Sequence, residues 1–307
     1  MNPATPALPA VEGAVRLHDW GVIRATGAEA ASFLHSQLTQ DMQHLQAGRA
    51  HLAGFCSAKG RLLATFVAWR QGDDILLACS ADLLPTVLKR LSMFVLRAKC
   101  KLSDAAADVP LWGLVGSGVP RAEAWSQATV GDADLIRLPD AVVAGNAVPR
   151  GLWAGVTPPA LPALDIELWR GLEAASGVAR VAAATAEQFV PQMVNLELVG
   201  GVNFQKGCYP GQEIVARSQY RGTLKRRAQV LGSAVPLQPG QEVFHAADPG
   251  QPAGRVVLSG RLPSGDAVAL VELKLAALDG GALHAGAADG PLLSLAALPY
   301  AIPAEQV

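Results

Sequence analysis

The 307-residue sequence has few cysteines, and their spacing excludes several kinds of site. The four are Cys56, Cys79, Cys100 and Cys208, and no two of them are close enough to form a CxxC pair. This spacing argues against a zinc or iron–sulfur ligand set within one chain. It also gives no sign of a dense disulfide framework, which favours a reducing compartment. We therefore predict no metal ligands in the chain.

The sequence also lacks long apolar runs and any excess of charge. No run of about 18 apolar residues is present, so we predict no membrane span. The first ten residues are rich in Pro and Ala and carry no basic residue, so they do not resemble a signal peptide. The formal net charge of −1 does not favour direct nucleic-acid binding, although a local basic face remains open. These features predict a soluble, cytoplasmic protein without a membrane partner.

Apolar residues are plentiful. They make up 50% of the chain, and the length predicts two or three domains. The first part alternates strands with helices. Strands at Leu62–Trp69 and Ile75–Cys79 are joined by a hairpin turn, and a helix over Ala81–Phe94 follows with Ser80 as its N-cap.

A second alternation of the same kind follows, which predicts α+β layers. It begins with a strand at Leu111–Val115, continues with a helix near Arg121–Ser126, and is completed by strands up to Leu152–Val156. After a Pro-rich boundary or linker at 157–162, a helix over Asp165–Ala175 ends at Gly177. Beyond it, short strands separated by Pro/Gly turns predict a small β-barrel. The predicted domains are 1–110, 111–224 and 225–307.

The segment with the most possible chemistry is Lys206-Gly207-Cys208-Tyr209-Pro210-Gly211-Gln212-Glu213. A thiolate is a nucleophile, and a neighbouring cation such as Lys206 favours it. Taken singly, each residue also has a structural interpretation. Cys208 fits a small buried residue, Lys206 a surface charge and Glu213 a helix start. The cluster as a whole is not well explained in this way, so we predict that Cys208 and Lys206 carry the chemistry.

This segment and several others resemble the YgfZ family of folate-binding proteins. The resemblance covers nearly the whole chain, and its most specific part is the string Lys-Gly-Cys-Tyr-x-Gly-Gln-Glu. The segments that carry it are Phe33–Asp41, Lys59–Leu62, Pro191–Leu196, Asn203–Arg217, Tyr220–Gly222 and Lys225–Arg226.

The resemblance implies the fold of the glycine-cleavage T-protein. This fold has two ferredoxin-like α+β domains around a central folate site and a C-terminal β-barrel. It also implies that tetrahydrofolate is the cofactor. The implied role is the maintenance of iron–sulfur enzymes, including tRNA-modifying ones, so those enzymes or their assembly machinery are the expected partners.

A folate site requires particular side chains. The pterin edge needs a carboxylate or amide, the aminobenzoate needs apolar or aromatic walls, and the glutamate tail favours cations. Our candidates for the edge are Gln192, Asn195 and Glu173. Tyr209 is a candidate for ring stacking. The candidates for the tail are Arg217 and Arg221.

An aminomethyltransferase needs a carboxylate beside the folate to stabilise a cationic intermediate. Leu63 and Ala64 stand roughly where the T-protein pattern has its acids, so this chain lacks them, unless Asp41 substitutes in space. A folate-binding accessory protein with Cys208 as a functional thiol is therefore the leading hypothesis. A true folate-dependent aminomethyltransferase and a folate-independent interaction module remain as alternatives.

Overall fold

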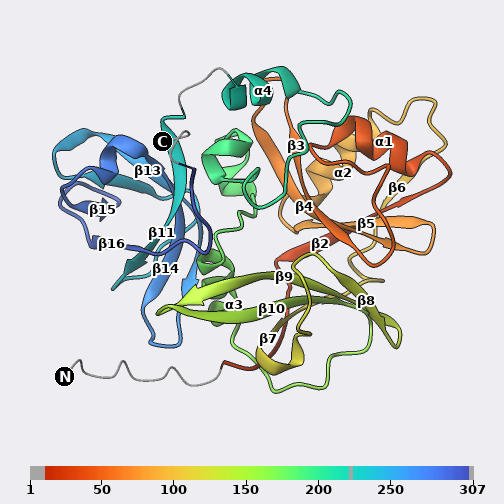
Figure 1. Cartoon of the computed structure of the whole chain (residues 1–307), viewed down its shortest axis with the longest axis horizontal. Coiled ribbons are helices and arrows are strands. Elements are labelled where there is room, and N and C mark those ends of the chain that lie inside the picture. Colours follow the sequence, from red (N-terminus) through yellow and green to blue (C-terminus); the bar gives the residue numbers. More distant parts are fainter. Residues whose placement is uncertain (1–10, 221–223, 304–307) are drawn as a thin grey trace.

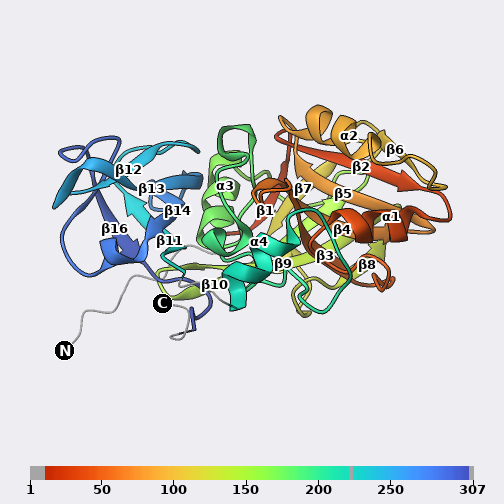
Figure 2. The same ribbon diagram turned by 90° about the horizontal axis from the view of Figure 1, so that it is seen from above.

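The computed structural model describes residues 11–220 and 224–303. It contains two five-stranded antiparallel sheets and one closed six-stranded barrel. Figure 1 shows the three parts side by side, with helix α3 (Ile166–Ala175) between the barrel and the sheets. Figure 2 shows the same order from above, with the barrel at one end of the molecule.

The first sheet is built from the N-terminal third of the chain and has two helices packed on it. Its strand β4 is buried over eight consecutive residues, which is typical of a strand that is covered on both faces. The strands, in spatial order, are β3 (Ala50–Cys56), β4 (Leu62–Gln71), β5 (Asp74–Ser80), β2 (Trp20–Thr26) and β6 (Lys101–Asp104). The helices are α1 (Ala30–Gln37) and α2 (Leu84–Ser92).

The second sheet takes one strand from the start of the chain. Strand β1 pairs antiparallel with β7, far from it in sequence. The strands, in spatial order, are β1 (Gly13–Arg16), β7 (Leu111–Val115), β10 (Asn146–Ala154), β9 (Ala133–Val143) and β8 (Gln127–Val130). A 3₁₀ turn, η1 (Gly116–Gly118), follows β7. The two sheets and α3 share one hydrophobic core, which makes this part of the molecule continuous.

Helix α3 joins the sheets to the barrel by very close packing. Asp165 caps its N-terminus, because the side chain accepts a hydrogen bond from the backbone N–H of Glu167. A side chain at Gly171 would place its Cβ 2.0 Å from the carbonyl oxygen of Arg261, so only glycine permits this approach. The helix ends before Gly177, whose φ of 68° lies in the left-handed region, as its sequence predicts.

The segment after α3 carries the 206–213 motif and leads to the barrel. It contains η2 (Ala183–Thr185), η3 (Pro191–Val194) and α4 (Gln212–Tyr220). The barrel has its own core. Its elements are β11 (Arg226–Ser233), β12 (Glu242–His245), β13 (Asp248–Arg261), β14 (Ala267–Lys274), η4 (Leu275–Leu278), β15 (Leu283–Ala285) and β16 (Leu292–Ala296). Pairing of β11 with β16 closes it. The predicted C-terminal barrel is thus confirmed.

Two local predictions are wrong. Ser80 is not the N-cap of α2, which begins after Leu83 without a side-chain cap; the Ser80 hydroxyl instead accepts a hydrogen bond from Arg180. No helix forms over 121–126. Trp125 there has a φ of 67°, and its backbone bonds to Arg137 and Ala50, one in each sheet. A left-handed residue that links two strands cannot continue a helix.

Candidate functional site

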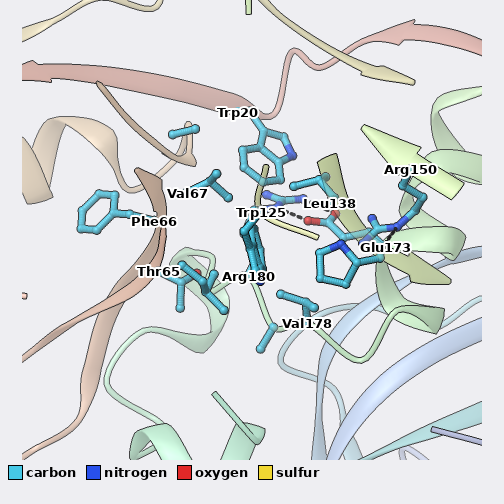
Figure 3. A pocket seen from close by; sticks show the side chains of 14 residues that line it. Trp20, Thr65, Phe66, Val67, Trp125, Leu138, Arg150, Glu173, Val178 and Arg180 are labelled. Carbon is cyan, nitrogen blue, oxygen red and sulfur yellow. Dashed lines mark hydrogen bonds and ion pairs between the residues drawn. The ribbon is translucent and has the colours of Figure 1, made fainter. Parts of the chain in front are cut away.

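A central pocket lies where the two sheets meet α3. Its free space is about 400 Å³ when space open to solvent is included, but a water-sized sphere can move in only about 30 Å³ of it, so the pocket is narrow compared with small-molecule sites. Figure 3 shows the lining side chains gathered around this space. They are Trp20, Leu52, Thr65, Phe66, Val67, Ala78, Trp125, Leu138, Pro139, Arg150, Glu173, Val178, Ala179 and Arg180.

A buried ion pair forms the polar wall of this pocket. Glu173, only 5% exposed, accepts hydrogen bonds from Arg180 at 2.7 Å and 3.0 Å. Arg180 also reaches Asp19 at 3.3 Å. Burial by itself lowers the pKa of Arg180, but the charges and hydrogen bonds of Glu173 and Asp19 outweigh burial and raise it above its usual value. Arg180 is therefore held in its charged form.

Aromatic rings and a second buried arginine complete the walls. The Arg180 guanidinium lies 4.8 Å from the centroid of the Trp20 ring, a cation–π contact. The indole N–H of Trp20 is buried and has no partner among the described residues. Arg150 is 2% exposed, donates to the carbonyl of Pro139 and stacks on Trp169. Burial lowers the pKa of Arg150 to about 10, so it stays cationic at neutral pH.

A wider hollow opens on the other side of the ion pair, towards the barrel. It holds about 1280 Å³, including space open to solvent, and shares Glu173 and Arg180 with the central pocket. Arg170 lines it and pairs with Asp19 at 3.1 Å and with Glu167 at 2.6 Å. The Glu173–Arg180 pair therefore separates a narrow apolar pocket from a broad charged one.

Cys208 lies elsewhere, in a cluster that we call the thiol corner: His35, Asp41, His44, Lys206 and Cys208. Cys208 is exposed, whereas Lys206 is buried. The Lys206 ammonium donates to the backbone carbonyls of Leu38, at 2.8 Å, and of His35. Burial lowers the pKa of Lys206 to about 8, although the charges of Asp41 and Cys208 act in the opposite direction.

Asp41 is the acid of the thiol corner and does not line the central pocket. Its carboxylate contacts His35 at 2.9 Å and His44 at 2.7 Å. Burial raises the pKa of Asp41, but hydrogen bonds from His44 and His35 outweigh it and lower the pKa to about 2. The other nitrogen of His35 lies 3.5 Å from where a Cβ on Gly207 would stand, so the histidine faces the thiol loop.

Two glycines hold the thiol loop against the β3–β4 hairpin. A Cβ on Gly211 would lie 2.4 Å from the carbonyl oxygen of Ser57 and 2.7 Å from the backbone nitrogen of Gly60. Both glycines have positive φ, 79° and 68°, which other residues rarely adopt. The motif segments at 33–41, 59–62 and 206–213 thus meet at one place, although they are distant in sequence.

The thiol corner and the central pocket are separate. Leu52 of β3 lines the pocket, whereas Ser57, just beyond the end of β3, contacts the thiol loop. Five residues of extended strand span roughly 16 Å. Cys208 and the other residues of the thiol corner are absent from the lining of the central pocket.

The remaining predicted site residues also lie apart from the pocket. Gln192 is buried and donates to the carbonyl of Val215 in α4; Asn195 is buried and donates to that of Ala228 in the barrel. Arg227, buried against both, pairs with Glu197. Tyr209 is buried, with the Lys206 ammonium 4.8 Å from its ring centroid, and burial raises its pKa. Arg217 is exposed on α4, and Arg221 lies outside the described residues.

Of the predicted cofactor-binding residues that the structure describes, only Glu173 lines the central pocket. Sequence reasoning missed Trp20, Trp125, Arg150 and Arg180. Arg180 comes seven residues after Glu173, beyond the end of α3, so helical spacing could not pair them. Trp125 was assigned to a helix that does not form. The six tryptophans of the chain were the signal that could have drawn attention to Trp20 and Trp125.

Neither a metal cluster nor a membrane-spanning helix is found within residues 11–220 and 224–303. No group of three or more His, Cys, Asp or Glu side chains there could hold a metal ion. No helix in that part of the chain is both long and apolar enough to cross a bilayer.

Comparison with known proteins relates the chain to two groups. No family model matches it. The tRNA-modifying protein YgfZ of Photorhabdus laumondii subsp. laumondii is 28% identical over 313 residues, covering 95% of this chain and 93% of the relative. The protein of the same name from Sodalis glossinidius is 27% identical over 305 residues, covering 94% and 93%.

Among solved structures, the glycine cleavage system aminomethyltransferase T from Bartonella henselae has a TM-score of 0.74 and 16% identity. The match covers 95% of this chain and 87% of that one. The resemblance to YgfZ proteins and the T-protein-like fold are thus confirmed.

Proposed function

We propose that this relative of the YgfZ proteins is a cytoplasmic, tetrahydrofolate-binding accessory protein. It supports the assembly or repair of iron–sulfur enzymes, including tRNA-modifying ones, and Cys208 is its functional thiol. The observation that carries the folate part is the central pocket, where a buried carboxylate and two tryptophans surround one space. The role towards iron–sulfur enzymes rests on the similarity to YgfZ proteins.

The chemistry of the lining side chains, rather than the volume of the pocket, suits a pterin ring. Glu173 offers carboxylate lone pairs for the ring's amino and N–H groups while it keeps its bonds to Arg180. Trp20 and Trp125 supply aromatic walls, and the unpaired indole N–H of Trp20 needs an acceptor such as a ring nitrogen or carbonyl. Bound tetrahydrofolate would supply a one-carbon acceptor. Its longer tail would have to leave the narrow pocket.

A specific observation weakens the aminomethyltransferase alternative. Glu173 is the only acid that lines the central pocket among the described residues, and its charge is already paired with that of Arg180. A carboxylate that is neutralised by an arginine stabilises a developing cation poorly. Asp41, the acid that could have substituted, belongs to the thiol corner.

The exposure of Cys208 supports a role in contact with a partner. Its side chain is exposed, and the loop around it is held by backbone packing at Gly60 and Gly211. A thiol on a fixed, exposed loop can meet a macromolecule, and this thiol is not part of the lining of the central pocket. Folate and thiol therefore act at two different places in our proposal.

Calorimetric titration with tetrahydrofolate tests the folate part, with quenching of tryptophan fluorescence as a second signal. We expect one binding event per chain. No detectable heat and no quenching would favour the folate-independent interaction module. Turnover in a glycine-cleavage assay with lipoyl-carrier protein would instead support the aminomethyltransferase.

Complementation of an iron–sulfur enzyme defect tests the thiol part. Cys208→Ala should fail to restore the enzyme although the protein folds, whereas Cys100→Ala, which removes a half-buried thiol elsewhere, should restore it. Full restoration by Cys208→Ala would refute the role of Cys208.

A further inference from the structure

One face of the first sheet carries unusually concentrated positive charge. Between residues 83 and 103 the chain has five basic residues and no acidic one, whereas the whole chain has a net charge of −1. All five are exposed. We call this surface the α2–β6 face; its cations are Lys89, Arg90, Arg97, Lys99 and Lys101.

These cations are not used within the molecule. Across the part of the chain that the structure describes, no hydrogen bond or ion pair is made by any of their side chains. Lys89 and Arg90 lie in the last turn of α2, where the helix dipole favours cations. Arg97 and Lys99 follow the helix, so the dipole does not account for them. Two acids that border the face accept hydrogen bonds from the backbone: Glu29 from the N–H of Lys99, and Asp104, at the end of β6, from the N–H of Ala106.

Large apolar side chains stand among the cations. Met93, Phe94 and Leu96 are 67%, 47% and 86% exposed. They are contiguous in sequence, and exposed apolar groups beside charge mark a binding surface. The face therefore offers both charge and apolar contact to a partner.

The packing of α2 argues against a lipid surface as that partner. A helix that lies on a membrane turns its apolar stripe into the lipid. The stripe of α2, formed by Leu84, Val87 and Leu91, is instead buried in the core of the first sheet. Only the short segment after the helix would remain to enter a bilayer.

From these observations we infer that the α2–β6 face binds RNA that presents phosphates and unstacked loop bases, as tRNA does. Three of its five cations are lysines, which protein interfaces avoid but phosphate contacts use. Phe94 supplies an exposed ring on which an unstacked base can lie. The inference goes beyond the folate-binding function and does not depend on it.

Fluorescence anisotropy with labelled total tRNA, at several salt concentrations, tests the inference. If three to five phosphates are contacted, the logarithm of the binding constant falls against that of salt with a slope of about −2 to −4. A fully paired RNA duplex of equal length should bind more weakly, because it has no free base for Phe94. Polyglutamate and anionic lipid vesicles should not bind.

Two variants separate charge from stacking. Lys89→Glu with Arg90→Glu should weaken tRNA binding at least tenfold and reduce the salt slope by about 2. Phe94→Ala should weaken binding about tenfold while the slope stays unchanged. All three residues are exposed, so unfolding temperatures should fall by only a few degrees, mainly because the two glutamates oppose the helix dipole at the end of α2. Arg121→Glu with Arg261→Glu is the matched control, because it changes the charge equally at exposed sites elsewhere.

Three results would overturn the inference. They are absence of tRNA binding at low salt, binding that the Lys89/Arg90 variant retains, and equal binding of tRNA and polyglutamate. Binding of vesicles in preference to tRNA would show that the face meets lipid instead. Tetrahydrofolate calorimetry on the same variants reports separately on the central pocket.

Discussion

Replacing Glu173 by Gln tests the polar wall of the central pocket. The carboxylate is 5% exposed and holds Arg180 through two short hydrogen bonds. Glutamine keeps one acceptor, but its amide NH₂ would face a guanidinium N–H. The change therefore leaves the buried Arg180 guanidinium without the negative charge and one of the two hydrogen bonds that Glu173 provides.

The size of the effect follows from what remains around Arg180. Removing one partner of a buried ion pair costs about 3–5 kcal/mol. Asp19, 3.3 Å from the Arg180 guanidinium, and the Ser80 hydroxyl, at 2.8 Å, stay in place and reduce this cost. We expect a loss of about 2–4 kcal/mol. At about 2 °C per kcal/mol for a chain of this size, the melting temperature should fall by about 4–8 °C.

The assay compares the thermal unfolding of Glu173→Gln with that of a control variant, Glu167→Gln. Glu167 is on the same helix and pairs with Arg170, but its side chain is 42% exposed, so its loss should cost at most about 1 kcal/mol. Glu173→Gln should also lose tetrahydrofolate binding, whereas Glu167→Gln should keep it. If both variants melt within a degree of each other, the argument that Glu173 and Arg180 form a buried, coupled pair is wrong.

Three further outcomes are expected. A thiol reagent should modify Cys208 rapidly, because it is exposed, whereas burial raises the pKa of the Cys56 thiol to about 12. A fast reaction that persists in the Cys208→Ser variant would contradict this. Asp41, with its pKa lowered to about 2 from 3.8, should contribute stability that is complete above pH 4 and is lost as the pH falls towards 2. The Asp41→Asn variant should therefore be less stable than the unchanged protein by about 1–2 kcal/mol at neutral pH, and this difference should vanish in unfolding curves measured in acid. A difference in stability that stays constant with pH would count against the two histidine contacts. Gly211→Ala should lower the free energy of unfolding in urea by more than about 2 kcal/mol, because its Cβ would clash with the β3–β4 hairpin. Gly200→Ala is the control: Gly200 also has a positive φ but no neighbour within 4 Å, so this change should cost only about 1 kcal/mol. Equal losses in the two variants would argue against the close packing of the thiol loop.

Much of the fold could be predicted from local pattern. The buried run of β4 and the Pro/Gly-punctuated strands of the barrel follow directly from apolar periodicity and turn residues. The pairing of β1 with β7 could not be predicted, because strand order depends on contacts between segments about 100 residues apart. The left-handed conformation of Trp125 could not be predicted for the same reason, since it is set by backbone hydrogen bonds to two sheets.

The candidate site could be predicted only in part. The sequence identifies the segments that form the thiol corner. It does not show that these segments meet, because the close approach at Gly60 and Gly211 is a property of tertiary packing. Glu173 was named among the pterin candidates, while its partner Arg180 comes from the loop beyond α3. Gln192 and Asn195 make buried bonds to α4 and to the barrel, a role that polar residue type alone does not reveal.

A structure with tetrahydrofolate bound tests the central claim most directly. The account predicts the pterin ring between Trp20 and Trp125, with its amino edge on Glu173 and no contact to Cys208. A pterin in the thiol corner, or one bound to Gln192 and Asn195 with the central pocket empty, would contradict it.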